Sequence, residues 1–308
     1  MKILIAYDGS KCSEAALDDL AKAGLPSDGD AQVITVAEVW LPPSQGIDGS
    51  VNDDRIEALL EHAREKGRAL VDAAEQNAAR AVERLRRILP SWSINSQTTY
   101  GSPAWEILRA ADSSEADLIV VGSQGHSAIS RLILGSISQK VLTEAHCSVR
   151  VARGKIETEP SAIRIAIGFD STKGAQAAVE AVAKRSWPEG TQVRLISVMQ
   201  DAAPTIIGKF VPAIVTAVDD VNDAEHAVLT ELATSALERL KAAGLEAEMH
   251  IESGVPKAAL VEHAEAWNAD SIFVGANAFG SRLERFMIGS TSSAVAARAH
   301  CTVEVVRH

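Results

Sequence analysis

The sequence predicts an α/β fold made of two tandem doubly wound domains, each a five-stranded parallel sheet with helices on both faces. Three observations predict it. The chain has 308 residues, a usual length for two domains. Short apolar runs alternate with helical patterns, as in parallel sheets whose strands are joined by helices. Matching motifs also recur in the same order in both halves, which indicates duplication.

Five short apolar runs in each half predict strands. They are Ile3–Tyr7, Gln32–Val36, Ile94–Thr98, Leu118–Val121 and Val149–Val151 in the first half, and Ile163–Phe169, Val193–Val198, Ala247–Ile251, Ser271–Val274 and Val303–Val306 in the second. Helical spacing of apolar residues predicts helices at Arg55–Leu89, Asn222–Ala243 and Ser136–Ala145. Gly244 stands where a glycine commonly ends a helix.

The duplication is clearest near the end of each half. Glu144–Arg153 reads EAHCSVRVAR, and Arg298–Arg307 reads RAHCTVEVVR. The polar segment 154–161, GKIETEPS, lies between two apolar strands and has the composition of a linker. We therefore expect a first domain at residues 1–153 and a second at 161–308.

Composition limits the classes of partner and compartment. The net charge of −11 and an aromatic content of 4% disfavour nucleic-acid binding, which needs a basic face and stacking side chains. No apolar run approaches the length of a membrane-spanning helix, so no membrane partner is expected. Three cysteines without a C-x-x-C pair fit free thiols in a reducing compartment. We expect a cytoplasmic protein.

A ligand site is expected beyond the carboxyl ends of the strands, where open parallel sheets bind ligands. Asp8 follows the first predicted strand. After the fourth strand comes G-x2-G-x9-G-S, formed by Gly122, Gly125, Gly135 and Ser136. The first two glycines let the backbone turn its N–H groups toward an anion, and Gly135-Ser136 opens a helix whose free N–H groups favour phosphate. The pattern is neither a Walker A loop nor the G-x-G-x-x-G fingerprint.

Both halves resemble universal stress protein domains, and the first carries the G-x2-G-x9-G-(S/T) pattern of the ATP-binding members of that family. The resemblance implies a sheet with strand order 3-2-1-4-5, ATP bound with a divalent metal such as Mg²⁺, and domains paired through their last strands. Here that pair is expected within one chain, with a further homodimer as an option. The implied binding residues in the first half are Asp8, Val36, Val121, Gly122, Gly125, Gly135, Ser136, Ile137 and Ser138.

The second half departs from this pattern. It keeps five of the matching residues: Asp170, Val198, Gly275, Gly289 and Ser290. The loop between the glycines is one residue longer, and the position of Gly125 falls on Ala278 or Phe279. Losing a glycine where φ is positive costs about 1–2 kcal/mol. We expect a weaker or altered nucleotide site here, or an empty one.

Several residues also have plain structural interpretations. Asp8 and Asp170 could cap the helix that follows the first strand of each half. The glycines could belong to ordinary turns, and Ser136 could be a simple N-cap. Arg84, Arg86 and Arg87 are expected to form a solvated face. His146-Cys147 and His300-Cys301 are expected in turns that enter the last strands, and segment 42–54 is a candidate lid over adenine.

Three functions follow from these patterns. The leading one is a nucleotide-binding regulatory protein of the stress response. The second is an enzyme, either a slow ATPase or a self-phosphorylating protein. It ranks lower because phosphoryl transfer needs charge stabilisation and a positioned nucleophile. Only His126 and Arg131 are basic candidates in the phosphate loop. No catalytic residue is assigned. The third is an interaction module that binds another ligand, or none.

Overall fold

The computed structural model describes residues 1–39, 54–125, 134–153, 162–199, 212–276 and 288–307. The predicted linker at 154–161, nearly all of the candidate lid at 42–54, His126 and Arg131, and the second-half loop with Ala278 and Phe279 lie outside the described residues.

The first half alternates strands and helices as the sequence predicts. Its elements are β1 (Lys2–Ala6), α1 (Lys11–Asp19), the 3-10 turn η1 (Leu20–Lys22), β2 (Asp30–Ala37), α2 (Asp54–Ile88), β3 (Ser93–Tyr100), α3 (Pro103–Ser114), β4 (Leu118–Gly122), α4 (Ser136–Glu144) and β5 (Ser148–Ala152). Helix α3 starts at Pro103, because the first helical position needs no N–H donor and suits the fixed φ of proline.

The second half repeats this order. Its elements are β6 (Arg164–Gly168), α5 (Lys173–Ala183), β7 (Gln192–Met199), α6 (Pro212–Ala242), β8 (Glu246–Ser253), α7 (Pro256–Ala266), β9 (Ser271–Gly275), α8 (Ser290–Arg298) and β10 (Thr302–Val306). Helix α6 starts at Pro212, ten residues before the predicted start, because the segment PAIVTAVDDV contains no residue that breaks a helix once proline occupies the first turn. Gly244 follows α6 with φ +83°, as expected of a helix-ending glycine.

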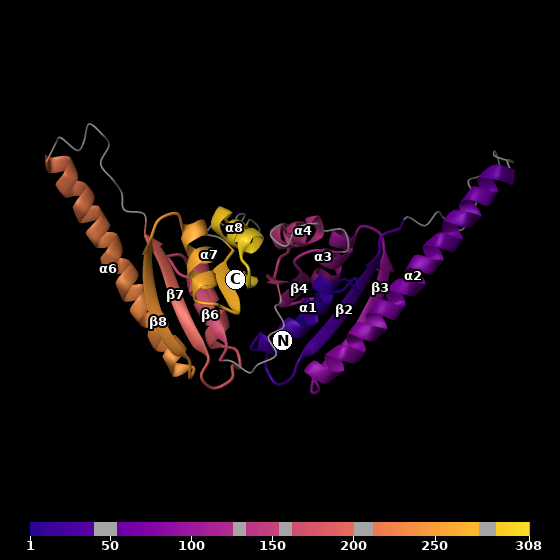
Figure 1. Ribbon diagram of the computed structural model, residues 1–308, viewed down its shortest axis with the longest axis horizontal. Helices are drawn as coiled ribbons and strands as arrows, with labels where there is room; N and C mark the ends of the chain where they lie inside the picture. Colours follow the sequence, from indigo (N-terminus) through magenta and orange to yellow (C-terminus); the bar gives the residue numbers. More distant parts are fainter. Residues whose placement is uncertain (40–53, 126–133, 154–161, 200–211, 277–287, 308) are drawn as a thin grey trace.

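All ten strands form one sheet in the order β3-β2-β1-β4-β5-β10-β9-β6-β7-β8. Within each half the strands are parallel and follow the predicted order 3-2-1-4-5. The last strands of the two halves, β5 and β10, pair antiparallel and join the halves. The expected fold and the pairing of two domains within one chain are confirmed. Figure 1 shows α2 and α6 flanking the outer ends of this assembly.

Helices cover both faces of the sheet. Alternate strand residues face opposite sides, so Ile3 and Ile5 pack beneath α1 and α2, whereas Leu4 packs beneath α3. On the α1 and α2 side each half has its own apolar core. On the side of α3, α4, α7 and α8 one apolar core runs across both halves. Among the described residues, no helix is long and apolar enough to cross a membrane.

Candidate functional site

The candidate site lies at the carboxyl edge of the sheet in the first half. Strand β1 lies between β2 and β4. The next strands, β2 and β3, are added on one side of β1, and β4 and β5 are added on the other. This is the reversal of strand order at which doubly wound sheets bind ligands. The residues that follow β1, β2 and β4 therefore meet at one edge.

Asp8 lies beside the glycine loop and does not cap the next helix itself. Its Oδ1 atom accepts a hydrogen bond from the backbone N–H of Ser10 at 2.9 Å. Ser10 is the N-cap of α1, and its hydroxyl accepts from the N–H of Ser13 at 3.2 Å. A Cβ atom placed on Gly125 would lie 3.2 Å from Asp8 Oδ2. The Asp8 carboxylate thus borders the space beside the loop that Gly125 leaves open.

Gly122 allows the end of β4 to pack closely on α1. A Cβ at this position would lie 2.8 Å from the backbone carbon and oxygen of Cys12, so the end of β4 packs directly on α1. Its backbone is in β4 and shows no positive φ. The Ser138 hydroxyl donates to the Gly122 carbonyl oxygen at 2.6 Å, and Val121 is buried in the core. Val121, Gly122 and Ser138 therefore pack the end of β4 against α1 and α4.

Gly135 brings the start of α4 back to the end of β4. Its N–H donates to the Ser123 carbonyl at 2.8 Å, and a Cβ on it would lie 3.8 Å from the N atom of Gly125. Gly135 is the N-cap of α4 with φ −65°, and it offers no side chain to the first-turn N–H groups. Those groups lack intrahelical acceptors by geometry and favour an anion. Ser136 and Ile137, the first residues of α4, are exposed there.

Val36 turns its peptide groups toward the same edge. The N–H of Tyr7 donates to the Ile34 carbonyl at 3.0 Å, which directs the peptide groups of Ile34 toward β1. Peptide groups two residues apart in a strand point the same way, so those of Val36 face the space just beyond the end of β1. The backbone of Val36 therefore lies at the same edge as Asp8 and the start of α4.

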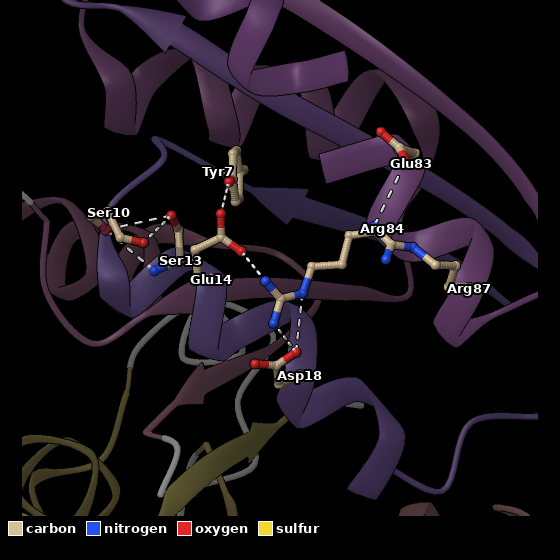
Figure 2. A network of polar contacts seen from close by, with 8 residues as sticks. All are labelled: Tyr7, Ser10, Ser13, Glu14, Asp18, Glu83, Arg84 and Arg87. Carbon is tan, nitrogen blue, oxygen red and sulfur yellow. Dashed lines mark hydrogen bonds and ion pairs between the residues drawn. The ribbon is translucent and has the colours of Figure 1, made fainter. Parts of the chain in front are cut away.

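A polar network beneath the site ties α1 and α2 to β1 (Figure 2). The buried Tyr7 hydroxyl donates to Glu14. Arg84 of α2 donates to Glu14 Oε2 at 2.6 Å and, through Nε, to Asp18 Oδ1 at 3.1 Å. Burial, followed by the bond to Glu14, raises the pKa of Tyr7, so its proton stays in place.

The expectation of a solvated arginine face is wrong for Arg84, whose side chain turns toward α1 and meets two carboxylates. Arg87 is exposed and lies 3.8 Å from Glu83. The signal for Arg84 was present in the sequence, because Glu14 and Asp18 stand one helical turn apart and share a face.

Sequence reasoning missed Asn77 of α2. Its side-chain amide donates to the Asp8 carbonyl oxygen at 3.3 Å and lies against Gly9, which has φ +79°. Arg80 in turn donates to Asn77. No local pattern marks Asn77, because it reaches the loop only through the packing of α2 on the sheet.

The matching edge of the second half repeats part of this geometry. Asp170 Oδ1 accepts from the N–H of Thr172 at 2.9 Å, and Thr172 is the N-cap of α5. Gly275 packs on the backbone of Gly174, where a Cβ would approach to 2.3 Å. The N–H of Gly289 donates to Ala276, and the first residue of α8, Ser290, is exposed.

The peptide groups of Val198 face beyond β6, because the N–H of Phe169 donates to the Ile196 carbonyl at 2.9 Å. One difference is clear at the first strand. Phe169 and Gln176 stand at the positions of Tyr7 and Glu14, so the hydroxyl–carboxylate contact is absent from this half.

The cysteine and histidine residues near the ends of the two halves were the remaining candidates for a metal site or a nucleophile. Within the described ranges, no group of three or more histidine, cysteine, aspartate or glutamate side chains could hold a metal ion. Burial raises the pKa of the Cys147 thiol to about 11 and that of Cys301 to about 12, so both thiols stay protonated near neutral pH. His146 pairs with Asp112 at 3.0 Å on the surface.

Fold and site together define a duplicated doubly wound α/β protein with a candidate ligand site at the carboxyl edge of each half. The model of the universal stress protein family matches residues 1–153 and 163–307. The chain therefore belongs to the universal stress protein family, as a tandem member.

Individual relatives agree with this assignment. A universal stress protein of Thermus aquaticus is 36% identical over 151 residues, 49% of this chain and 97% of the relative. One from Methanocaldococcus jannaschii is 30% identical over 155 residues, 49% of this chain and 81% of the relative. Among solved structures, a universal stress protein from Archaeoglobus fulgidus has a TM-score of 0.62 at 21% identity, covering 100% of this chain and 96% of that one.

Proposed function

We propose that the first half binds ATP with Mg²⁺ at the edge formed by β1, β2, β4 and α4, and that occupancy regulates the protein in a stress response. One observation carries the proposal. The Asp8 carboxylate, the start of α4 and the peptide groups of Val36 converge where the strand order reverses. An acidic acceptor for ribose, an amide-rich helix start for phosphate and a strand edge for adenine are the groups that a nucleotide needs.

Each residue of the site then has a role in binding. Asp8 accepts hydrogen bonds from the ribose hydroxyls, and Val36 holds adenine through its backbone. Gly125 and Gly135 leave room for the phosphates, and the N–H groups and hydroxyl at Ser136 and the N–H of Ile137 bind them. Val121, Gly122 and Ser138 keep β4 and α4 in place. Mg²⁺ would be held mainly by phosphate oxygens and water, which is its usual coordination at nucleotides, and it would neutralise phosphate charge.

We propose a weaker or altered site in the second half, formed by Asp170, Val198, Gly275, Gly289 and Ser290. The edge repeats the strand and helix ends but lacks the Tyr7–Glu14 contact beneath them. Free thiols at three cysteines support a cytoplasmic setting for the whole protein.

Binding fits the site better than turnover. The residues that converge on the edge supply hydrogen-bond donors and one carboxylate, and Asp8 lies at the nucleoside end. Slow ATP hydrolysis or self-phosphorylation is the alternative, and an interaction module without nucleotide is the third. Phosphate release or protein phosphorylation that is lost in a binding-defective variant would favour the enzyme.

A matched pair of substitutions tests the proposal. Asp8→Asn keeps an oxygen that accepts from the N–H of Ser10, but it removes the negative charge of the group that accepts from the ribose hydroxyls. A hydrogen bond to a charged group is worth about 1.5–3 kcal/mol, so ATP·Mg affinity measured by calorimetry should fall by about 10–100-fold. Asp170→Asn is the control and should leave the first-half affinity unchanged.

The number of nucleotides bound per chain, measured by mass analysis of the purified protein, reports on the second half. A value near one supports binding by the first half alone, and a value near two means that both bind. If wild-type protein neither retains nucleotide nor binds ATP·Mg at about millimolar concentration, a range in which nucleotide sites bind, the proposal is wrong.

A further inference from the structure

The join between the halves is symmetric about the middle residue of each last strand. In the antiparallel pair of β5 and β10, Arg150 lies opposite Glu304, Val149 opposite Val305 and Val151 opposite Val303. Arg150 and Glu304 are each the middle residue of their strand and match one another in the duplicated sequence. The pseudo-two-fold axis therefore passes between these two residues, as an isologous interface requires.

The two central residues carry opposite charges and are fully buried. Arg150 donates to Glu304 Oε2 at 3.1 Å and to Asp19 Oδ2 at 2.6 Å. Arg185 donates to the same Glu304 oxygen at 2.8 Å. Burial alone would lower the pKa of Arg150, but the carboxylates of Asp19 and Glu304 outweigh it and raise the pKa. The centre of the join is thus a balanced set of two arginines and two carboxylates.

The rest of the join is nearly symmetric. Arg153 leaves the end of β5 and donates to carbonyl oxygens at the end of α8, including Ala297 at 3.1 Å. Arg307 leaves the end of β10 and donates to the Leu142 carbonyl at the end of α4 at 2.8 Å. The apolar core beneath these helices is continuous. These contacts would form equally well between two first halves or two second halves.

We propose that the opposite charges of Arg150 and Glu304 make each half pair with the other half of its own chain and reject a like half of a second copy. Pairing of two first halves would set arginine against arginine at the axis, and pairing of two second halves would set glutamate against glutamate. Buried like charges in contact are strongly unfavourable, and such clashes are a means by which interfaces exclude wrong partners.

The flanking ions follow the same asymmetry. Asp19 and Arg185 have alanines, Ala181 and Ala23, at the matching positions of the other half. Each half therefore brings a countercharge for its own central ion, Asp19 for Arg150 and Arg185 for Glu304. Within each half, the central charged side chain therefore already has a partner of opposite charge. The contact between the two central residues is the one that is attractive in the correct pairing and repulsive in a pairing of like halves.

Charge reversal in the full-length chain tests this inference. Arg150→Glu leaves one arginine among three carboxylates at the centre, and Glu304→Arg leaves one carboxylate among three arginines. Breaking a buried ion pair is strongly destabilising, so each variant should unfold about 10 °C below wild type. The double variant Arg150→Glu/Glu304→Arg restores opposite charges at the axis but sets each new side chain beside a like charge of its own half, at Asp19 or Arg185. It should therefore be a monomer that unfolds above both single variants and below wild type. Arg87→Glu, on the exposed face of α2, is the control for altered net charge.

A rescue experiment with two different chains tests whether the Arg150–Glu304 pair selects the partner half or only stabilises the join. Chains carrying Arg150→Glu and Glu304→Arg are co-expressed with different tags, so that neither has to fold alone. Each half of one chain then finds its opposite charge only in the other chain. We expect co-purification at 1:1 and a dimer by native mass spectrometry, above the level seen for two wild-type chains. Co-purification at the wild-type level, or single variants that unfold with wild type, would overturn the proposal.

Discussion

Two neighbouring glycines of the candidate site should respond to the same substitution in opposite ways. Gly122→Ala places a methyl group 2.8 Å from the backbone of Cys12, and a backbone in a packed helix cannot move aside. Such overpacking costs about 1–3 kcal/mol, which corresponds to a fall of about 3–10 °C in unfolding temperature for a domain of this size. Gly125→Ala places its methyl 3.2 Å from the Asp8 carboxylate, a side chain that can shift by a few tenths of an ångström.

We therefore expect Gly125→Ala to unfold with wild type in the absence of nucleotide and to bind ATP·Mg about 10–100-fold more weakly, because the methyl fills the space beside Asp8 and disturbs one charged contact. Gly122→Ala should instead lower the unfolding temperature in the absence of nucleotide. Differential scanning calorimetry without ligand and titration calorimetry with ATP·Mg measure the two effects separately. The reasoning fails if Gly122→Ala unfolds at the wild-type temperature, or if Gly125→Ala loses as much stability as Gly122→Ala.

Two further predictions concern stability. Arg84→Ala removes the contacts to Glu14 and Asp18 and should lower the free energy of unfolding by about 1 kcal/mol, a value that allows for solvent screening of this partly exposed side chain. Arg87→Ala, the control, should change it by less than about 0.5 kcal/mol. Equal effects of the two substitutions in urea unfolding would contradict the network of Figure 2. Burial raises the pKa of Cys301 to about 12, so above pH 9 the unfolded thiol loses its proton before the folded one, and stability should fall by up to about 1.4 kcal/mol per pH unit. Cys301→Ala should flatten that alkaline loss, and an unchanged slope would count against it.

The fold was predictable because its signals are local and repeated. Apolar strands between helical patterns, together with the repeated AHC segments, predict two parallel domains, and the family resemblance supplies their strand order. The early start of α6 was missed because its first ten residues, PAIVTAVDDV, are mostly apolar and lack the spacing of apolar residues on one face that identifies a helix in a sequence.

The sequence predicted which residues lie at the candidate site, but not every contact that these residues make. Spacing identified Gly122, yet the structure explains it by contact with Cys12, which lies far away in the sequence. Asn77 contacts the Asp8 loop across a long sequence separation, and no motif marks such a contact. The charge reversal at Arg150 and Glu304 was visible in the two repeated segments, but its meaning depends on the register of β5 and β10.

The antiparallel join sets the candidate edges of the two halves at opposite ends of the β5–β10 pair. Because β5 and β10 run in opposite directions, the carboxyl ends of the strands in one half lie beside the amino ends in the other. Helix α4 begins with Ser136 at the candidate edge of the first half, and the carbonyl of Leu142 near its other end accepts a hydrogen bond from Arg307, which follows β10. Helix α4 therefore contacts both halves of the chain, one at each of its ends.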